Sequence, residues 1–428
     1  MSYNIFSKAA PVMPGAGKGT EVCKLLLSQA SSDMREALLP MALVALSAHV
    51  SEVEFLYPDG RYHELCGQMG HLVAASGVGK GQLTPLVEAL MRSFRAHDKG
   101  VYESLAEWAR QTKTRAANKP KPERPEAPLW FPPADMTHPF FIQNAMALES
   151  QGGRTQYLNL PEVEMADRLC GGHRNVSQII RNIYDRERAG QVRATADGVT
   201  GEALLRVSIT MSSTPLAARR FYKNDLLNGL FGRIAFAYRP RTARTGCIPR
   251  QGRYEGEWLD RMDVYLERLA RSKGRFIVPG LNKTCLALSE EMARLADKAD
   301  DDLLYEISHR SVLTAWKKGA LLWLLHSQEW TRSIARHVEW FCHYDLWSKL
   351  QIFGDMLQTA SQDTAPAKTG PSNMLDDLPR TFHPSQLESL RTARGKAPEG
   401  TDHQLAVWKS RGFISYSKET GMYTKVES

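Results

Sequence analysis

The sequence contains no apolar run long enough to span a membrane. Its longest apolar stretches, residues 39–48 and 319–325, are far shorter than the roughly 20 residues that cross a bilayer as a helix. The chain also does not open with the basic, apolar and small-residue pattern of a secretory signal peptide. We therefore expect a cytoplasmic protein that has no membrane partner.

Cysteine is scarce, and no two cysteines are close in the sequence. The six cysteines include no Cys-x-x-Cys pair. Structural zinc sites and small disulfide-stabilised folds depend on closely spaced cysteines, so neither is expected here. We expect the thiols to be reduced and buried.

The composition is that of a globular protein, and its 428 residues are enough for about three domains. Hydrophobic residues make up 43% of the chain and charged residues 24%, which argues against general disorder. The net charge of +8 favours anionic partners, among which nucleic acid is the commonest large one.

Residues 71–94 predict a loop that binds phosphate. A short apolar strand at 71–75 runs into Ser-Gly-Val-Gly-Lys-Gly, and residues 82–94 have the apolar spacing of an amphipathic helix. Glycines let backbone N–H groups point into one concavity, the helix adds its positive end, and the lysine reaches the terminal phosphates. The residues expected to bind the nucleotide here are Ser76, Gly77, Val78, Gly79, Lys80, Gly81 and Gln82.

This loop departs from the G-x-x-x-x-G-K-S/T pattern at two positions. Ala74 stands at the first glycine, and Gly81 stands where a hydroxyl group would bind magnesium. Gln82 and Thr84 are then the nearest polar candidates. A plain glycine turn before a helix is the alternative interpretation.

A second glycine-rich loop at residues 13–20 matches the pattern better as a string, with Lys18 as its lysine. However, residues 7–11 do not form an apolar strand, and a P-loop needs its strand as a scaffold. We therefore favour the loop at Lys80.

A strand followed by acids predicts a catalytic carboxylate. Residues 155–160 form the strand, and Pro161, Glu162 and Glu164 follow it. Glu162 stands where a glutamate would orient the attacking water, and Glu164 is a candidate magnesium ligand, directly or through water. A solvated acidic turn is the alternative.

Two further segments add candidate residues for phosphoryl transfer. A predicted strand at 203–212 is followed by Ser213 and Thr214, which we expect to sense the terminal phosphate from beside the acid. Arg233 is a candidate arginine finger, which would stabilise the phosphoryl group bound by a neighbouring subunit. An ordinary turn and an ordinary surface arginine are the alternatives.

Five segments in this order resemble the P-loop ATPases encoded by bacterial prophages and integrative elements, which are labelled primase- or helicase-like. This family of ATPases is itself distantly similar to the helicase domains of phage and viral primase–helicases. The resemblance covers about residues 35–245 and rests on residues 75–81, 161–164, 180–187, 212–215 and 228–233. It implies ATP hydrolysis with Mg²⁺ during DNA processing. Pro161 is a departure, because many such motors have aspartate there.

Basic residues are concentrated in residues 174–193 and 219–253. The second segment holds nine lysines and arginines against one acid, Asp225. Phosphate contacts dominate the affinity of proteins for nucleic acid, and a ring that moves along DNA would line its pore with such charge. A solvated surface is the alternative. The DNA contacts expected here are Arg219, Arg220 and Lys223.

The last fifty or so residues have the element order of a winged helix. Helices are predicted at 384–394 and from 401, and a hairpin joins 413–416 to 422–426. Such modules place the second helix in the DNA major groove. From residue 376 onward the net charge is only +1, so a protein partner is an equal alternative. The candidate DNA contacts are Gln404, Lys409, Arg411 and Lys418.

The predicted fold is α/β, with a P-loop NTPase core of the AAA+ or helicase-like kind, a helical domain and a C-terminal winged-helix-like domain. The tryptophans of the helical region are expected to form a core stripe. The expected boundaries are 1–35 for an N-terminal segment, 36–250 for the ATPase core, 254–357 for the helical domain, 358–376 for a linker and 377–428 for the winged-helix-like domain.

Together these patterns predict an ATP-dependent, helicase-like DNA-processing motor of a mobile element or prophage. We expect it to act as a homo-oligomer in replication or mobilisation, with a separately encoded primase or replication protein as a candidate partner. One alternative is a nucleotide-binding replication initiator with little turnover, which the missing hydroxyl at Gly81 and the proline at Pro161 favour. A less favoured alternative is a small-molecule phosphotransferase that uses Lys18.

Overall fold

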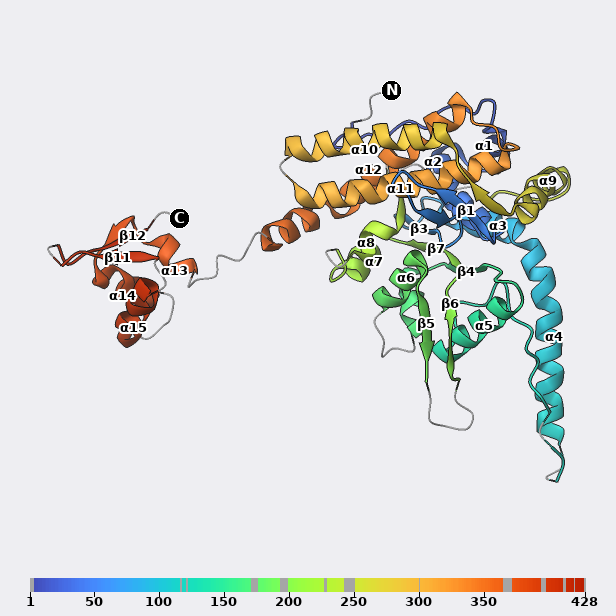
Figure 1. Ribbon diagram of the computed structural model, residues 1–428, viewed down its shortest axis with the longest axis horizontal. Helices are drawn as coiled ribbons and strands as arrows, with labels where there is room; N and C mark the ends of the chain where they lie inside the picture. Colours follow the sequence, from blue (N-terminus) through green and yellow to red (C-terminus); the bar gives the residue numbers. More distant parts are fainter. Residues whose placement is uncertain are drawn as a thin grey trace. The chain divides into compact units, whose positions relative to one another are not determined.

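The chain forms two compact units, Met1–Ala360 and Ser361–Ser428 (Figure 1). The computed structural model describes residues 4–115, 118–120, 122–170, 176–192, 199–226, 229–241, 251–299, 301–364, 372–393, 398–410, 413–418 and 420–426. Among the helices in these ranges, none is both long enough and apolar enough to cross a membrane.

A four-stranded parallel sheet lies at the centre of the first unit. Its strands, in order across the sheet, are β4 (Gln156–Leu160), β7 (Val207–Ser213), β3 (Met69–Ala74) and β8 (Ala235–Arg239). All three pairings are parallel, so the carboxyl ends of the four strands lie at one edge. Parallel strands need crossover connections, usually helical, and the sheet is surrounded by helices. The predicted α/β class is confirmed.

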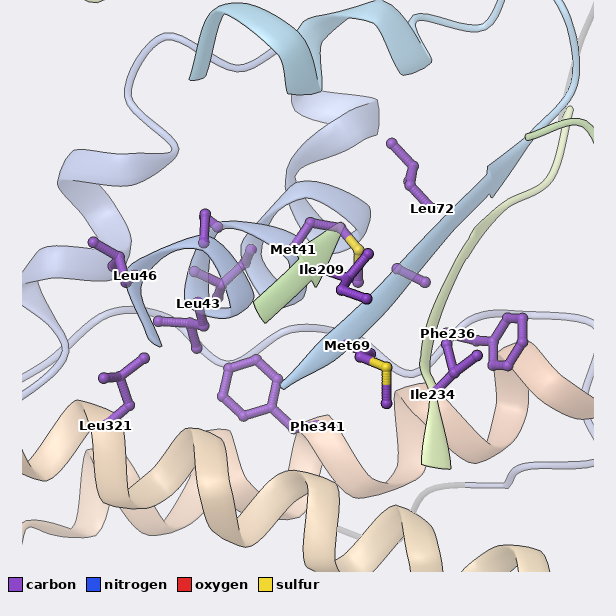
Figure 2. Close-up of a cluster of buried hydrophobic side chains, with 14 of the residues drawn as sticks. Met41, Leu43, Leu46, Met69, Leu72, Ile209, Ile234, Phe236, Leu321 and Phe341 are labelled. Atoms are coloured by element: carbon purple, nitrogen blue, oxygen red, sulfur yellow. The ribbon is translucent and has the colours of Figure 1, made fainter. Parts of the chain in front are cut away.

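The helix α2 (Arg35–Ser47) is buried against this sheet. Its last eleven residues are all buried, and it contacts β3, β7 and β8. A helix that is apolar all round belongs in the interior of a protein. Gly70 of β3 leaves room for the Met41 side chain, because a Cβ there would lie 2.7 Å from Cε of Met41. Figure 2 shows Met41 beside the strands. The apolar stretch of residues 36–50 predicts a helix with Pro40 near its first turn, but Pro40 lies inside α2.

The prediction of one strand over residues 203–212 is wrong, because the structure has two strands there. The chain forms β6 (Gly201–Leu204), which pairs with β5 (Arg188–Gln191) in a hairpin, and only then enters the sheet as β7. Arg206 lies at the break and pairs with the buried Glu64 at 3.1 Å. The alternation of apolar residues continues through the break, so the pattern alone does not reveal it.

The other helices of the sheet region connect or flank the strands. The helix predicted at 82–94 is split at Met91, and its second part, α4, extends away from the sheet (Figure 1). The elements are α1 (Glu21–Leu26), η1 (Ser32–Met34), η2 (Lys80–Gln82), α3 (Leu83–Leu90), α4 (Arg92–Thr114), α5 (His138–Ser150), η3 (Val163–Cys170), α6 (Val176–Asp185), α7 (Pro215–Tyr222) and α8 (Leu230–Arg233).

Four long helices follow the sheet in the sequence and share its core. Figure 2 shows Leu321 and Phe341 of this region close to α2, and they belong to the same buried cluster as the sheet. Where the sequence predicted an ATPase core and a separate helical domain, the structure has one continuous core. The helices are α9 (Glu257–Arg271), α10 (Pro279–Ala299), α11 (Asp302–Leu325) and α12 (Arg332–Thr364).

A small second sheet also joins the helical region to the rest of the unit. The strand β1 (Val53–Leu56) pairs with β2 (Tyr62–Glu64) in an antiparallel hairpin and with β9 (Gly274–Phe276) in parallel. The strand β9 lies within residues 254–357, which the sequence predicted to form a helical domain. Its pairing partner is more than 200 residues away in the sequence, and no local pattern indicates it.

The N-terminal segment packs against α12 through tryptophan side chains. The indole N–H groups of Trp340 and Trp347 donate to the carbonyl oxygens of Pro11 and Ser7, each at 2.9 Å. Together with Trp316, these tryptophans are fully buried. The predicted core stripe is therefore confirmed.

The second unit has a small core of its own. Its strands form an antiparallel sheet in the order β10-β12-β11, and Phe382, Leu387 and Trp408 are buried together. The predicted helices and hairpin are present, and α13 and β10 are additional. The linker predicted at 358–376 is shorter, because helices occupy both of its ends. The elements are α13 (Ser372–Asp377), β10 (Thr381–Phe382), α14 (Pro384–Ala393), η4 (Pro398–Gly400), α15 (Thr401–Ser410), β11 (Ile414–Tyr416) and β12 (Tyr423–Lys425).

Candidate functional site

The loop 75–79 leaves β3 at the carboxyl edge of the sheet. Gly77 (φ +81°) and Gly79 (φ +101°) lie in the left-handed region, which glycine adopts without steric cost. A Cβ on Gly77 would meet no atom within 4 Å, so this side of the loop is open. The loop leads into η2 and α3. An open glycine loop before a helical segment has the form of an anion-binding loop.

Lys80 and Glu162 meet at this edge of the sheet. Nζ of Lys80 lies 3.1 Å from Oε1 and 3.4 Å from Oε2 of Glu162. Glu162 follows β4, and β7 lies between β4 and β3, so the acid and the loop follow strands that are not adjacent in the sheet. The side chains are 21% and 56% exposed. A pair this exposed is weakly held, and an anion could displace the carboxylate from the lysine.

The protein offers few ligands for magnesium at this loop. Gly81 has no hydroxyl group. Gln82 is buried, and its amide accepts from the N–H of Ser31 at 3.0 Å and donates to the Ser31 hydroxyl at 2.9 Å. Glu164 is exposed at the start of η3. The described residues contain no cluster of three potential metal ligands. Of the residues expected at this site, Glu164 is the carboxylate that could hold Mg²⁺.

The expected phosphate sensors form hydrogen bonds within the fold. Ser213 is buried, and its Oγ lies 2.8 Å from Nε2 of His71, whose Nδ1 lies 3.0 Å from the Tyr222 hydroxyl. Thr214 caps the N-terminus of α7. Burial, followed by the charge of Lys80, lowers the pKa of His71 to about 3, so its ring is neutral. His71 thus links β3 to β7, a connection that the sequence did not suggest.

Arg233, the expected arginine finger, is held inside its own chain. Its Nη2 lies 2.6 Å from Oδ2 of Asp185, and its Nη1 donates to the Gly229 carbonyl at 2.7 Å. Its guanidinium also lies over the ring of Tyr184, and 13% of the side chain is exposed. To serve a neighbouring subunit, Arg233 would have to leave these partners. Arg233 is therefore engaged by Asp185 within its own chain, and its role toward a neighbouring subunit stays a prediction.

Arg241 contacts the candidate phosphate loop directly. Its Nη2 donates to the carbonyl oxygen of Ser76 at 2.6 Å. Arg241 follows β8, the parallel neighbour of β3 in which Arg239 lies opposite Ala74. The sequence indicated Arg241 only as one member of a basic segment. A basic residue just after a parallel strand is the signal that could have identified it, once the strand order is known.

The expected DNA contacts of the first unit differ in their surroundings. Arg219 donates to Oδ1 of Asp355 at 2.7 Å and to the Ile352 carbonyl at 2.9 Å, so it ties α7 to α12. Arg220 and Lys223 are exposed. The structure thus leaves two of the three side chains accessible to a phosphate backbone.

The second unit presents two of its four candidate contacts at the surface. The ammonium of Lys409 lies 5.8 Å from the ring centre of Tyr416, and Lys418 is exposed in the hairpin. The side-chain oxygen of Gln404 accepts a hydrogen bond from Arg391. Arg411 lies outside the described residues.

The glycine-rich loop at residues 13–20 is packed against the connection between α11 and α12. Nζ of Lys18 lies 2.6 Å from Oε1 of Glu329. A Cβ on Gly19 would lie 2.7 Å from the Thr331 hydroxyl oxygen. No strand occurs in the described residues 4–20. The loop at Lys80 is therefore the better candidate for phosphate.

Three charged side chains, Lys80, Glu162 and Arg241, come from three different strand ends at one edge of the sheet. Two cations and one acid beside an open glycine loop can hold a polyphosphate and orient a water against it. A scan of the chain against protein-family models and a search of curated proteins both find no match.

Proposed function

We propose that this chain is a P-loop NTPase of the helicase-like kind that binds and hydrolyses ATP with Mg²⁺. The observation that carries the proposal is the 3.1 Å contact between Lys80 and Glu162 beside the left-handed Gly77 and Gly79. Phosphoryl transfer to water needs a cation for the phosphates and a group that orients the nucleophile, held close together. The carboxyl edge of a parallel sheet is where such ligands bind in open α/β folds.

The loop, Lys80 and Glu162 have separate roles in the proposed reaction. The N–H groups of the loop and Nζ of Lys80 bind the β- and γ-phosphates. Binding draws Lys80 away from Glu162, whose freed carboxylate orients the attacking water. The magnesium ion that accompanies ATP offsets the charge of the phosphate oxygens. The strand order supports this assignment, because β7, which bears Ser213, lies between the loop strand and the acid strand.

We further propose that the second unit is a winged-helix module, and that the whole chain is an oligomeric DNA-processing motor of a mobile element. Its order of α13, β10, α14, α15, β11 and β12 supports this, because two helices precede a hairpin on a three-stranded sheet. In such modules the second helix enters the major groove. Lys409 and Lys418 are the contacts to test first.

ATP hydrolysis by the purified full chain, with and without DNA, tests this function. We expect DNA to stimulate hydrolysis and Lys80→Ala to abolish nucleotide binding. Lys18→Ala is the matched control, since it removes the lysine of the other glycine-rich loop, and it should behave as the wild type. Loss of hydrolysis only in Lys18→Ala would overturn the assignment of the loop.

Glu162→Gln separates chemistry from binding. We expect unchanged ATP affinity and a loss of hydrolysis of about 100-fold or more, because a positioned general base is removed. Glu164→Gln, which removes the candidate magnesium ligand of the same turn, should raise the Mg²⁺ concentration needed for hydrolysis and should change the rate at saturating Mg²⁺ far less. The opposite result would place the catalytic acid two residues further along the chain.

A nucleotide-gated DNA-binding protein with little turnover is the second candidate. The absence of a hydroxyl at residue 81 and the engagement of Gln82 with Ser31 favour it, because both reduce the ligands available to magnesium. This candidate predicts ATP-dependent DNA binding without DNA-stimulated hydrolysis, so the same assay separates it from the motor.

A further inference from the structure

We infer that Arg241 binds the phosphates of the nucleotide from within the same chain. This inference rests on the proposed function, because it assigns a further residue to the same site. Arg241 would act on the nucleotide bound by its own chain, whereas the sequence suggested an arginine supplied by a neighbouring subunit.

The backbone brings Arg241 to the loop. The strand β8 runs parallel to β3, with Tyr238 opposite Val73 and Arg239 opposite Ala74. Both strands therefore end at the same edge, and the chain leaves β8 beside the start of the phosphate loop. Arg239 pairs with Asp33 at 3.5 Å, and Arg241, two residues further on, returns to the loop.

The guanidinium already touches the backbone that would wrap the phosphates. Its Nη2 donates to the Ser76 carbonyl at 2.6 Å, and the Arg241 side chain is otherwise exposed. An arginine carries five N–H donors in a planar fork, which matches the oxygens of a phosphate group in a bidentate manner. A guanidinium at this place can therefore contact a bound phosphate after a small side-chain movement.

The negative charge of a bound nucleotide would need a second cation beside Lys80. Residue 81 lacks the hydroxyl that would help to hold magnesium, and Glu162 adds a negative charge beside Lys80. Arg233 is occupied by Asp185. Arg241, in contrast, contacts the loop through the carbonyl oxygen of Ser76. We assign to it part of the charge compensation that magnesium supplies at other phosphate loops.

Titration of the full chain with fluorescent ATP and ADP analogues, without DNA, tests the inference. Arg241→Ala should weaken ATP binding by about tenfold or more, because a charge-assisted hydrogen bond to the phosphates is lost. The loss should be larger for ATP than for ADP, and Arg241→Lys should restore part of it. Arg271→Ala is the control for an equal change of net charge, because Arg271 is exposed on α9.

Different results would contradict the role of Arg241 and the proposed function. If Lys80→Ala loses ATP binding and Arg241→Ala binds ATP like the wild type, the inference is wrong and the function stands. If the wild type binds neither nucleotide, both are wrong. If Arg241→Ala and Arg271→Ala weaken binding equally, the effect is one of net charge, and the inference is again wrong. Thermal unfolding of each variant checks that the exposed substitutions leave the fold intact.

Discussion

Gly81 is the residue at which the candidate loop departs most clearly from the phosphate-loop pattern. A Cβ at this position would meet only Nε2 of Gln251, at 3.4 Å, which is an ordinary contact. Its φ angle is not in the left-handed region, so other residues can adopt this backbone. The position therefore accepts a hydroxyl-bearing side chain.

We predict that Gly81→Thr raises ATP hydrolysis and lowers the Mg²⁺ concentration at which it is half-maximal. The threonine hydroxyl would supply the missing ligand for magnesium, and the effect on rate should be about tenfold. Hydrolysis measured over a range of Mg²⁺ concentrations checks this. Gly81→Ala adds the Cβ without the hydroxyl and should show no gain. An equal gain in both variants would mean that backbone stiffening is responsible.

Lys318 is a buried cation in the middle of α11. Its Nζ has no hydrogen-bond partner among the described residues, and the side chain is almost fully buried. Burial, opposed in part by Asp345, lowers the pKa of Lys318 from 10.5 to about 8. The folded state therefore releases the proton at lower pH than the unfolded state. Its penalty is fully present below pH 8 and is relieved between about pH 8 and 10.5.

We predict that Lys318→Met stabilises the first unit at pH 7 by about 1–3 kcal/mol, because it replaces a buried charge with an apolar chain of similar length. The gain should shrink as the pH rises from 8 to 10.5. Urea denaturation at several pH values measures it. Lys317→Met is the comparison, because burial lowers the pKa of Lys317 to about 8 as well. It should gain less, since the Lys317 ammonium lies 4.6 Å from the ring centre of Tyr184 and loses that contact in the variant. A gain that does not depend on pH would contradict the titration argument.

At the scale of secondary-structure elements, the ion pair between Arg233 and Asp185 joins α8 to α6. Both side chains are partly buried, at 13% and 31% exposed. Such a pair stabilises the contact between two short helices, and removal of either partner leaves the other charge without compensation.

We predict that Arg233→Ala and Asp185→Ala each lower the free energy of unfolding by about 1–2 kcal/mol, and that the double variant loses less than the sum. Chemical denaturation of the three variants checks this. Because Arg233 is held by Asp185, Arg233→Ala should by itself keep most of its hydrolysis, and mixing it with Lys80→Ala subunits should recover nothing further. Recovery in a proven mixed oligomer would mean that Arg233 leaves Asp185 to act on a neighbour, as the sequence first suggested.

At the scale of the whole molecule, the chain carries two separate hydrophobic cores. The cluster around Phe382 and Trp408 in the second unit is distinct from the large cluster of the first unit. Each unit has the buried apolar side chains that a stable fold needs, so either can be removed without opening the core of the other.

We predict that a chain ending at residue 364 keeps ATP affinity and the thermal unfolding of the first unit. Its DNA affinity should fall tenfold or more, because the module assigned to DNA is missing. Fluorescence anisotropy with labelled DNA measures this. Full-length Lys409→Ala and Lys418→Ala should weaken DNA binding in the same direction and should show a smaller salt dependence. Equal DNA affinity of the shortened chain would place the DNA site in the first unit.

Local sequence patterns predict well those strands and helices that are buried along their whole length. The strand before the loop and the strand before Glu162 both occur close to their expected places. Apolar spacing is a local property, so each of these follows from a few neighbouring residues. The predicted loop at residues 76–81 likewise has the open, left-handed glycine backbone that its composition suggested.

Contacts between distant segments are the part that the pattern does not predict. The pairing of β9 with β1, the ion pair that holds Arg233 and the contact of Arg241 with Ser76 each join residues far apart in the chain. Which of several arginines reaches a site depends on strand order and on the nearest carboxylate.

The sequence by itself therefore determined the α/β class, the loop and its lysine, and the acid that follows β4. Each of these depends on residue types at fixed local spacing. Only the tertiary structure decided that Lys80 and Glu162 lie within one hydrogen bond, that Asp185 holds Arg233 and that Arg241 lies at the loop. The physical reason is that charges pair with whichever partner the fold brings nearest, and nearness in space follows from strand order rather than from position along the chain.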